Sequence, residues 1–250
     1  MQTFQTGLVS ISFRPYTVDQ ILAACRQAEL SWIEWGSDVH VKVGDGALAD
    51  EVAKKTADAG MRCITYGSYF RIGHTPIEEL NAYLDSACRL GARNIRMWCG
   101  NTPSARATPD IRAKIVEDGR ICAEQAAKHG LNVTLECHSG TLTDECESAM
   151  RYLAEVDHPA MRMYWQPCQF HSEDYNRAAA QAYAPHTECL HVFHWDASRR
   201  YPLQEGARIW ADYLRPFAAQ PREIGLLLEF MHDDRIESLA QTAAALRSWL

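Results

Sequence analysis

The chain has 250 residues, of which 47% are hydrophobic and 23% are charged. Its 25 basic and 32 acidic side chains give a formal net charge of −7, which provides no general attraction to nucleic acid or to anionic membranes. No apolar run approaches the roughly 20 residues that span a bilayer, and the opening segment MQTFQTGLVS lacks the features of a signal peptide. We therefore expect a cytoplasmic, globular protein that forms one domain over residues 1–250.

Short apolar runs alternate with amphipathic segments along the whole chain. The runs are rich in valine, isoleucine, leucine and tryptophan, which is typical of strands buried on both faces. In chain order, the expected strands are 8–13, 32–35, 62–66, 94–98, 132–136, 162–165, 190–194 and 225–230. The expected helices are 17–29, 47–59, 76–90, 108–129, 143–156, 173–183, 205–218 and 236–249.

Capping residues support these helices. Thr108-Pro109 joins a cap to a residue suited to the first helical turn, and Gly60, Gly91 and Gly130 each follow a helical segment. Eight strand–helix repeats predict an α/β fold, a single (β/α)₈ TIM barrel. A doubly wound open sheet is the alternative. We favour the barrel because acids and histidines occur at strand ends throughout the chain, and because no Gly-x-Gly-x-x-Gly loop is present.

Polar side chains mark the carboxyl ends of the predicted strands. In a barrel these ends meet at one mouth, where the sequence would place Arg14, Glu34, Tyr66, Trp98, Glu136, Gln166, His191 or His194, and Glu229. Strands five to eight would supply two carboxylates, an amide oxygen and an imidazole around one point. Such a mixed set of oxygen and nitrogen donors suits Mn²⁺, Mg²⁺, Co²⁺ or Zn²⁺.

Several short segments of the chain are similar in sequence to those of a known family. The segments SWIEWGSDVHV, TYGSYFRIG, LECHSGTLT, MYWQP, LHVFHWD and LLLEF resemble those of the xylose-isomerase-like sugar isomerases and epimerases, and the resemblance covers essentially the whole chain. It implies a TIM-type barrel with one divalent metal ion, most often Mn²⁺, held by Glu136, Gln166, His191 and Glu229. It also implies that the two glutamates act as catalytic acid and base.

Two positions depart from the family pattern. Gln166 occupies the place of an aspartate, which removes one negative charge and predicts a weaker or more labile metal site. Gln169 occupies the place of a histidine, and His171 lies two residues further on as a candidate replacement.

Further side chains are expected to bind the substrate. Glu34 would orient the substrate or a neighbouring histidine, and an ion pair with Arg14 or Arg71 is the alternative for it. Aromatic side chains could pack on the apolar face of a sugar. The complete predicted substrate-binding set is Glu34, His40, Tyr66, Trp98, His138, His171 and His194.

The chemistry expected from this site is proton transfer beside a carbonyl group through an enediolate. Return of the proton gives epimerisation or aldose–ketose isomerisation of a sugar or sugar-like ketone, the function favoured here. Loss of a β-hydroxyl would instead make the protein a dehydratase or lyase of a keto-sugar or keto-cyclitol. A phosphodiesterase resembling the apurinic-site endonucleases is less favoured, and a binding module with a decayed metal site is a further alternative. The expected partners are a small sugar-derived substrate and a second copy in a homodimer, with no nucleic acid and no membrane.

Overall fold

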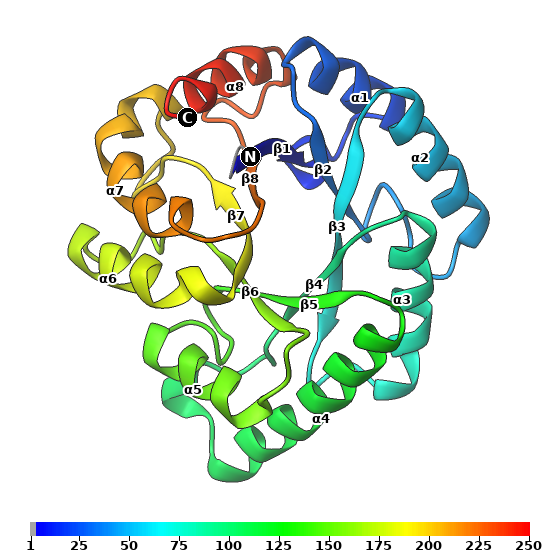
Figure 1. Ribbon diagram of the computed structural model, residues 1–250, viewed down its shortest axis with the longest axis vertical. Helices are drawn as coiled ribbons and strands as arrows, with labels where there is room; N and C mark the ends of the chain where they lie inside the picture. The colour runs from blue at the N-terminus through cyan, green and yellow to red at the C-terminus, as the bar shows by residue number, and fades with distance from the viewer. Residues whose placement is uncertain (1–3) are drawn as a thin grey trace.

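Eight parallel strands close into a barrel in the order β1 to β8, and helices surround it (Figure 1). The structure is a computed structural model that describes residues 4–250, so the first three residues of MQTFQTGLVS lie outside the described residues. The strands are β1 Phe4–Val9, β2 Trp32–Gly36, β3 Arg62–Arg71, β4 Asn94–Trp98, β5 Asn132–Glu136, β6 Met161–Trp165, β7 Thr187–Val192 and β8 Ile224–Leu228. The predicted (β/α)₈ barrel is confirmed.

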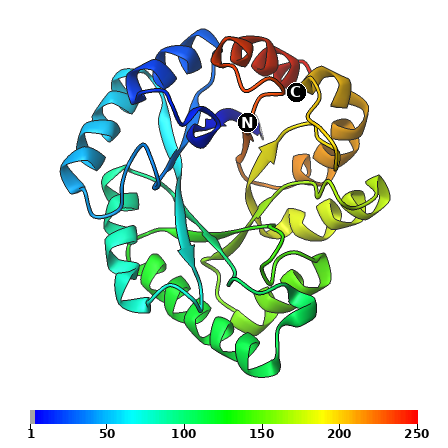
Figure 2. The same cartoon turned by 180° about the vertical axis from the view of Figure 1, so that it is seen from behind.

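A helix follows each strand and forms part of the outer ring. The helices are α1 Val18–Gln27, α2 Gly46–Asp58, α3 Leu80–Arg89, α4 Pro109–Lys128, α5 Cys146–Val156, α6 Glu173–Tyr183, α7 Ala207–Ala218 and α8 Leu239–Arg247. Figure 2 shows the same ring from the opposite side, with α8 beside α1. Within residues 4–250, no helix has the length and apolar character needed to cross a bilayer.

Local capping interactions set where the helices begin. The side chains of Thr17 and Gln20 form a reciprocal capping box at α1. Thr108 accepts a hydrogen bond from the backbone of Ile111, and proline occupies the first turn of α4. The predicted helix starts at these two caps are therefore correct to within one residue.

The first strand differs from its prediction. Residues 8–13 were expected to be extended, but β1 ends at Val9 and Ser10–Phe13 forms a 3₁₀ helix. The Oγ of Ser10 accepts a hydrogen bond from the backbone of Gly36, and the Oγ of Ser12 accepts one from the backbone of Phe230. Ser10 is thus tied to the last residue of β2 and Ser12 to the loop after β8, and because β1 ends at Val9, Arg14 is not at a strand end.

Two layers of side chains fill the inside of the barrel. An apolar cluster consists of Val9, Ile11, Trp32, Ile64, Tyr164, Cys189 and Leu227. Nearer the carboxyl ends of the strands, the buried side chains are charged or polar and include Glu34, Arg96, Glu136 and His191. Because side chains alternate along a strand, each of these residues is aimed inward by its register. The polar layer is the floor of the candidate site.

Candidate functional site

Four side chains predicted as metal ligands converge at the ends of β5 to β8. Glu136, His191 and Glu229 each offer a ligand atom, and these atoms lie within 4.8 Å of one another. The Nδ1 atom of His191 is 3.8 Å from Oε1 of Glu136 and 3.5 Å from Oε2 of Glu229. The Oε1 atom of Gln166 lies 2.6 Å from the same Nδ1. The nitrogen of that amide donates to the carbonyl of Cys137 at 3.0 Å, which turns the amide oxygen toward His191.

The local register explains this convergence. His191 is the second-last residue of β7, whereas Glu229 lies one residue beyond β8. Phe230 follows with a φ of 46°, in the left-handed region that bulky side chains rarely adopt, so the chain turns immediately after Glu229. His194 lies beyond the end of β7 and is not part of this group.

The electrostatics of the group fit a divalent cation. Burial lowers the pKa of His191 to about 3, so its ring is neutral and can offer a lone pair. Burial raises the pKa of Glu229 well above its ordinary value, and Glu136 adds to the effect. Within the described chain, the Glu229 carboxylate accepts no hydrogen bond and the Nε2 atom of His191 has no partner. Two carboxylates, an amide oxygen and a neutral imidazole can together hold Mn²⁺, Mg²⁺, Co²⁺ or Zn²⁺.

A buried arginine that the sequence analysis missed lies under the group. Arg96 on β4 is 2% exposed, and its Nε atom is 2.9 Å from Oε1 of Glu34. Its Nη1 atom and the Nε1 atom of Trp98 both donate to Oε2 of Glu136. Burial would raise the pKa of Glu136, but Arg96, together with His191, His138 and the Trp98 N–H, holds it below the ordinary value. Glu136 therefore keeps one oxygen, Oε1, for a metal ion.

A signal for Arg96 was present in the segment NIRMW. An arginine in the centre of an apolar strand, two residues before Trp98, shares the inward register of that tryptophan. A buried guanidinium requires carboxylate partners, and the sequence offers inward acids at Glu34 and Glu136. The alternative prediction for Glu34, an ion pair with Arg14 or Arg71, is therefore right in kind but named the wrong arginines. Arg14 pairs with Asp38 at 2.8 Å.

Three predicted substrate-binding residues are placed away from the mouth. Glu34 is fully buried against Arg96. Tyr66 is also fully buried and donates to the carbonyl of Val41 at 2.8 Å, because Gly67 takes the inward position on β3 and the alternation turns Tyr66 outward. His40 uses both ring nitrogens, at 3.0 Å from Oγ of Ser10 and 3.2 Å from the carbonyl of Tyr16. The structure does not bring these three side chains to the ligand group.

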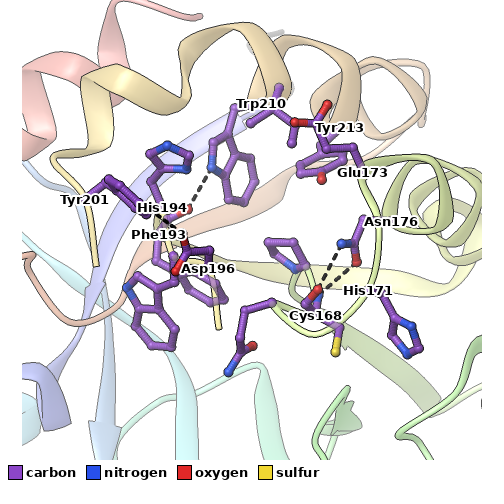
Figure 3. Close-up of a pocket in the computed structure, with 14 residues that line it drawn as sticks. Cys168, His171, Glu173, Asn176, Phe193, His194, Asp196, Tyr201, Trp210 and Tyr213 are labelled. Atoms are coloured by element: carbon purple, nitrogen blue, oxygen red, sulfur yellow. Dashed lines mark hydrogen bonds between the residues drawn. The ribbon is translucent and has the colours of Figure 1, made fainter. Parts of the chain in front are cut away.

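The other predicted residues surround the mouth. A cavity of about 390 Å³ opens above the ligand group, and His138 and His171 are part of its wall. The ring centroids of Trp98 and His138 are 4.9 Å apart, and Cζ of Arg71 lies over the Trp98 ring at 3.9 Å from its centroid. His171 lies 3.0 Å from Glu145 and stacks on Tyr175. His194 lines a second cavity beside the first (Figure 3).

Comparison with known proteins gives a family match over most of the chain. The family described as xylose isomerase-like TIM barrel matches residues 22–250. A 3-dehydroshikimate dehydratase of Bacillus anthracis is 38% identical over 69 residues. That match covers 28% of this chain and 25% of the relative, so only a quarter of the relative's length is spanned.

Three solved structures share the fold over nearly the whole chain. The probable 3-DHS dehydratase of Bacillus anthracis, involved in petrobactin synthesis, has a TM-score of 0.78 at 19% identity and covers 97% of this chain and 98% of its own. A D-allulose 3-epimerase from Methylomonas sp. has 0.75 at 14% identity, covering 100% and 99%. A protein from Mycobacterium smegmatis in complex with magnesium has 0.72 at 13% identity, covering 99% and 98%. At these identities the likeness establishes the fold.

Proposed function

The chain belongs to the xylose isomerase-like TIM barrel family, and from that premise we propose that it is a metal-dependent enzyme that removes a proton beside the carbonyl of a small hydroxylated ketone. One observation carries the proposal: Glu136, Gln166, His191 and Glu229 converge at the base of a cavity. Among the described side chains, no lysine or arginine lies within 4 Å of the buried Glu229 carboxylate, and His191, which does, is neutral. A buried acid in that position is either protonated or paired with a cation, and a bound metal ion would supply the cation.

The four ligands would hold one divalent ion, with Mn²⁺ as the expected metal. When bound, the ion would polarise the substrate carbonyl and lower the energy of the enolate left by proton loss. Glu136 would bind through Oε1, because its other oxygen already accepts from Arg96 and Trp98. Gln166 would bind through the oxygen that its bond to Cys137 points inward. Glu229 is then the carboxylate best suited to move a proton.

The two glutamates differ in the hydrogen bonds that they accept, and this difference favours elimination of water. A carboxylate that already accepts two hydrogen bonds, one from a guanidinium, is a poor base, so Glu229 would act as the single acid–base group. It would take the proton from the carbon beside the carbonyl, and the C–H electron pair would form the enolate. The enolate would expel the β-hydroxyl, Glu229 would return the proton to it, and water would leave. The dehydratase relative supports this order of preference.

Isomerisation or epimerisation of a sugar-like ketone is the second candidate. Epimerisation needs a group that returns the proton to the opposite face of the carbon, and His138 lines the same cavity as Glu229. The phosphodiesterase alternative is disfavoured, because Glu136, His191 and Glu229 form the one cluster of this kind found in residues 4–250.

Two measurements test the proposal. Elemental analysis of protein purified without chelator should find about one equivalent of a divalent metal in the wild type and none in His191→Ala. NMR in deuterium oxide should then follow cyclic hydroxyketones, such as 3-dehydroshikimate, beside ketoses. Loss of water with new vinyl or aromatic signals indicates elimination, whereas deuterium incorporation without loss of water indicates epimerisation or isomerisation.

Matched variants separate the roles of the two glutamates. Glu229→Gln should abolish turnover while the fold, checked by circular dichroism, is retained. Glu136→Gln should weaken metal binding more than it changes turnover at saturating metal. Turnover by Glu229→Gln at the wild-type rate, or absence of metal after incubation with Mn²⁺, would remove the basis of the proposal.

A further inference from the structure

A second cavity of about 360 Å³ lies beside the one above the metal ligands. It is bounded by α6, α7 and the loops that follow β6 and β7 (Figure 3). Cys168, Gln169, His171 and Trp195 line both cavities, so the two share one wall. The two cavities are therefore adjacent, and a ligand that occupied both would have to pass these side chains.

Aromatic side chains line this second cavity, where Trp195 and Tyr201 are half-buried and Phe193, Trp210 and Tyr213 are almost fully buried. Phe193 and Trp195 are stacked at 3.9 Å between ring centroids. Trp210 and Tyr213 on α7 also line it, as Figure 3 shows, and Nε1 of Trp210 donates to the carbonyl of Phe193 at 2.8 Å. That bond anchors the indole between the loop and the helix. Fixed aromatic faces are suited to the apolar C–H face of a ring-shaped ligand.

The polar groups of the cavity divide into those already paired and those still available. Asp196 accepts from Ser198 and Tyr201, and Glu173 accepts from Arg208 at 2.9 and 3.0 Å. By contrast, within the described chain the imidazole of His194 has no hydrogen-bond partner although it is half-buried. Burial lowers the pKa of His194, so the ring offers one donor and one acceptor.

The charge of the lining selects against anionic ligands. The described residues that line the cavity include no lysine and no arginine, and Arg208 and Arg200 beside it are paired with Glu173 and Asp234, so the lining itself offers no cation to a phosphate or a carboxylate. Its two acids have partners of their own, as described above. The free groups, His194 and the half-buried Gln169 amide on the shared wall, suit hydroxyl groups.

We propose that this cavity is a binding subsite for a neutral, hydroxylated ring, such as a sugar ring, that forms the part of the substrate distant from the reacting carbonyl. The two cavities have volumes of about 360 and 390 Å³, near the lower end of the range for small-molecule sites, so each suits one ring. The link to a reacting carbonyl rests on the proposed function. The binding of a neutral ring does not rest on it, because none of the four proposed metal ligands lines this cavity.

The test is a binding titration on the metal-free protein. Trp195 and Trp210 line the cavity, so tryptophan fluorescence should report its occupation. The probes are the methyl glycosides of glucose, galactose and mannose, with gluconate as the anionic comparison. We expect at least one glycoside to give a saturable change in the millimolar range, and gluconate to give none.

Two variants locate the binding. His194→Ala should weaken it by about three- to tenfold, the loss expected for one hydrogen bond. Ile209→Phe should abolish it by filling the cavity from α7. His129→Ala, at the end of α4 and outside both cavities, is the control and should bind as the wild type does.

Two results would overturn the subsite. One is the absence of a saturable change with all three glycosides, and the other is equal affinity in the wild type and in Ile209→Phe. Failure of the proposed function is a separate result, since a protein that binds no metal could still bind a glycoside here. Glycoside binding without metal uptake would leave the subsite in place and reject the enzyme.

Discussion

Replacement of Arg96 by methionine tests whether the buried ion network supports the site. The guanidinium is 2% exposed and lies between Glu34, which is fully buried, and Glu136, which is 5% exposed. Methionine has a similar length and fits an apolar barrel interior, but it supplies no charge. The substitution therefore leaves two buried carboxylates without the cation that now contacts both.

The expected loss of stability depends on how many buried carboxylates are left without a cation. Removing one partner of a buried ion pair costs about 3–5 kcal/mol. With a metal ion at the ligand group, Glu136 keeps a cation and chiefly Glu34 is left unpaired, so the metal-loaded variant should lose about that amount. Without metal both acids are unpaired, and the loss should be larger. Native proteins have only about 5–15 kcal/mol of stability, so the metal-free variant should be close to unfolding.

Urea denaturation followed by circular dichroism measures both states, with saturating Mn²⁺ and with EDTA. The double variant Arg96→Met with Glu34→Gln removes one unpaired charge and should recover about 1–3 kcal/mol relative to the single variant. A loss below about 1 kcal/mol in EDTA, or no recovery in the double variant, would refute the view that Arg96 neutralises both acids.

Three further predictions concern other contacts of the site. EDTA should lower the thermal midpoint of the wild type but not that of His191→Ala. A metal ion at about 100 times its Kd stabilises the folded state by about 2.7 kcal/mol, and EDTA removes this contribution. An equal fall of the midpoint in both proteins would contradict the ligand set. Gly67→Ala would place a Cβ 2.4 Å from Oε1 of Glu34 and should cost about 1–3 kcal/mol in urea denaturation, whereas Gly46→Ala, which meets only the flexible side chain of Arg89, should cost less. Burial lowers the pKa of His40 below 6.5, so as the pH falls His40 takes up a proton in the unfolded chain before it does so in the folded one. The stability advantage of the wild type over His40→Asn should therefore shrink below pH 6.5. A constant difference in the free energy of unfolding from pH 8 to 5 would exclude this titration.

The fold was predictable because its signals are local and repeated. Each strand reads as a short apolar run and four of the eight helices begin with a side-chain cap, so the alternation predicted an α/β fold, and the acids and histidines at strand ends favoured a barrel over an open sheet. The error at residues 8–13 arose because Ile11 and Phe13 continue the apolar pattern of β1. Nothing local shows that Ser10 and Ser12 accept hydrogen bonds from Gly36 and Phe230, which are distant in sequence.

The site was predictable in part, for reasons that depend on register. Glu136 and Glu229 end apolar runs, so their position at the mouth follows once a barrel is assumed. Tyr66 was misplaced because β3 shifts register against its neighbours, which brings Gly67 inward. A shift of this kind arises from contacts between strands and leaves no mark in the local sequence.

The charge of the buried layer changes the meaning of Gln166. From the sequence, the neutral amide predicted a weaker metal site because an aspartate is expected there. The structure adds Arg96, which contacts two of the three buried carboxylates of the layer, Glu34, Glu136 and Glu229. When a bound metal ion keeps Glu229 ionised and His191 is neutral, three carboxylates and one guanidinium would leave two negative charges, which a divalent cation would balance. An aspartate in place of Gln166 would leave a third negative charge in a layer shielded from water, where an unbalanced charge is costly. The amide is therefore consistent with a site whose charge matches that of a divalent ion. Gln166 attracts the ion less than an aspartate would, but it also adds no repulsion among the buried carboxylates.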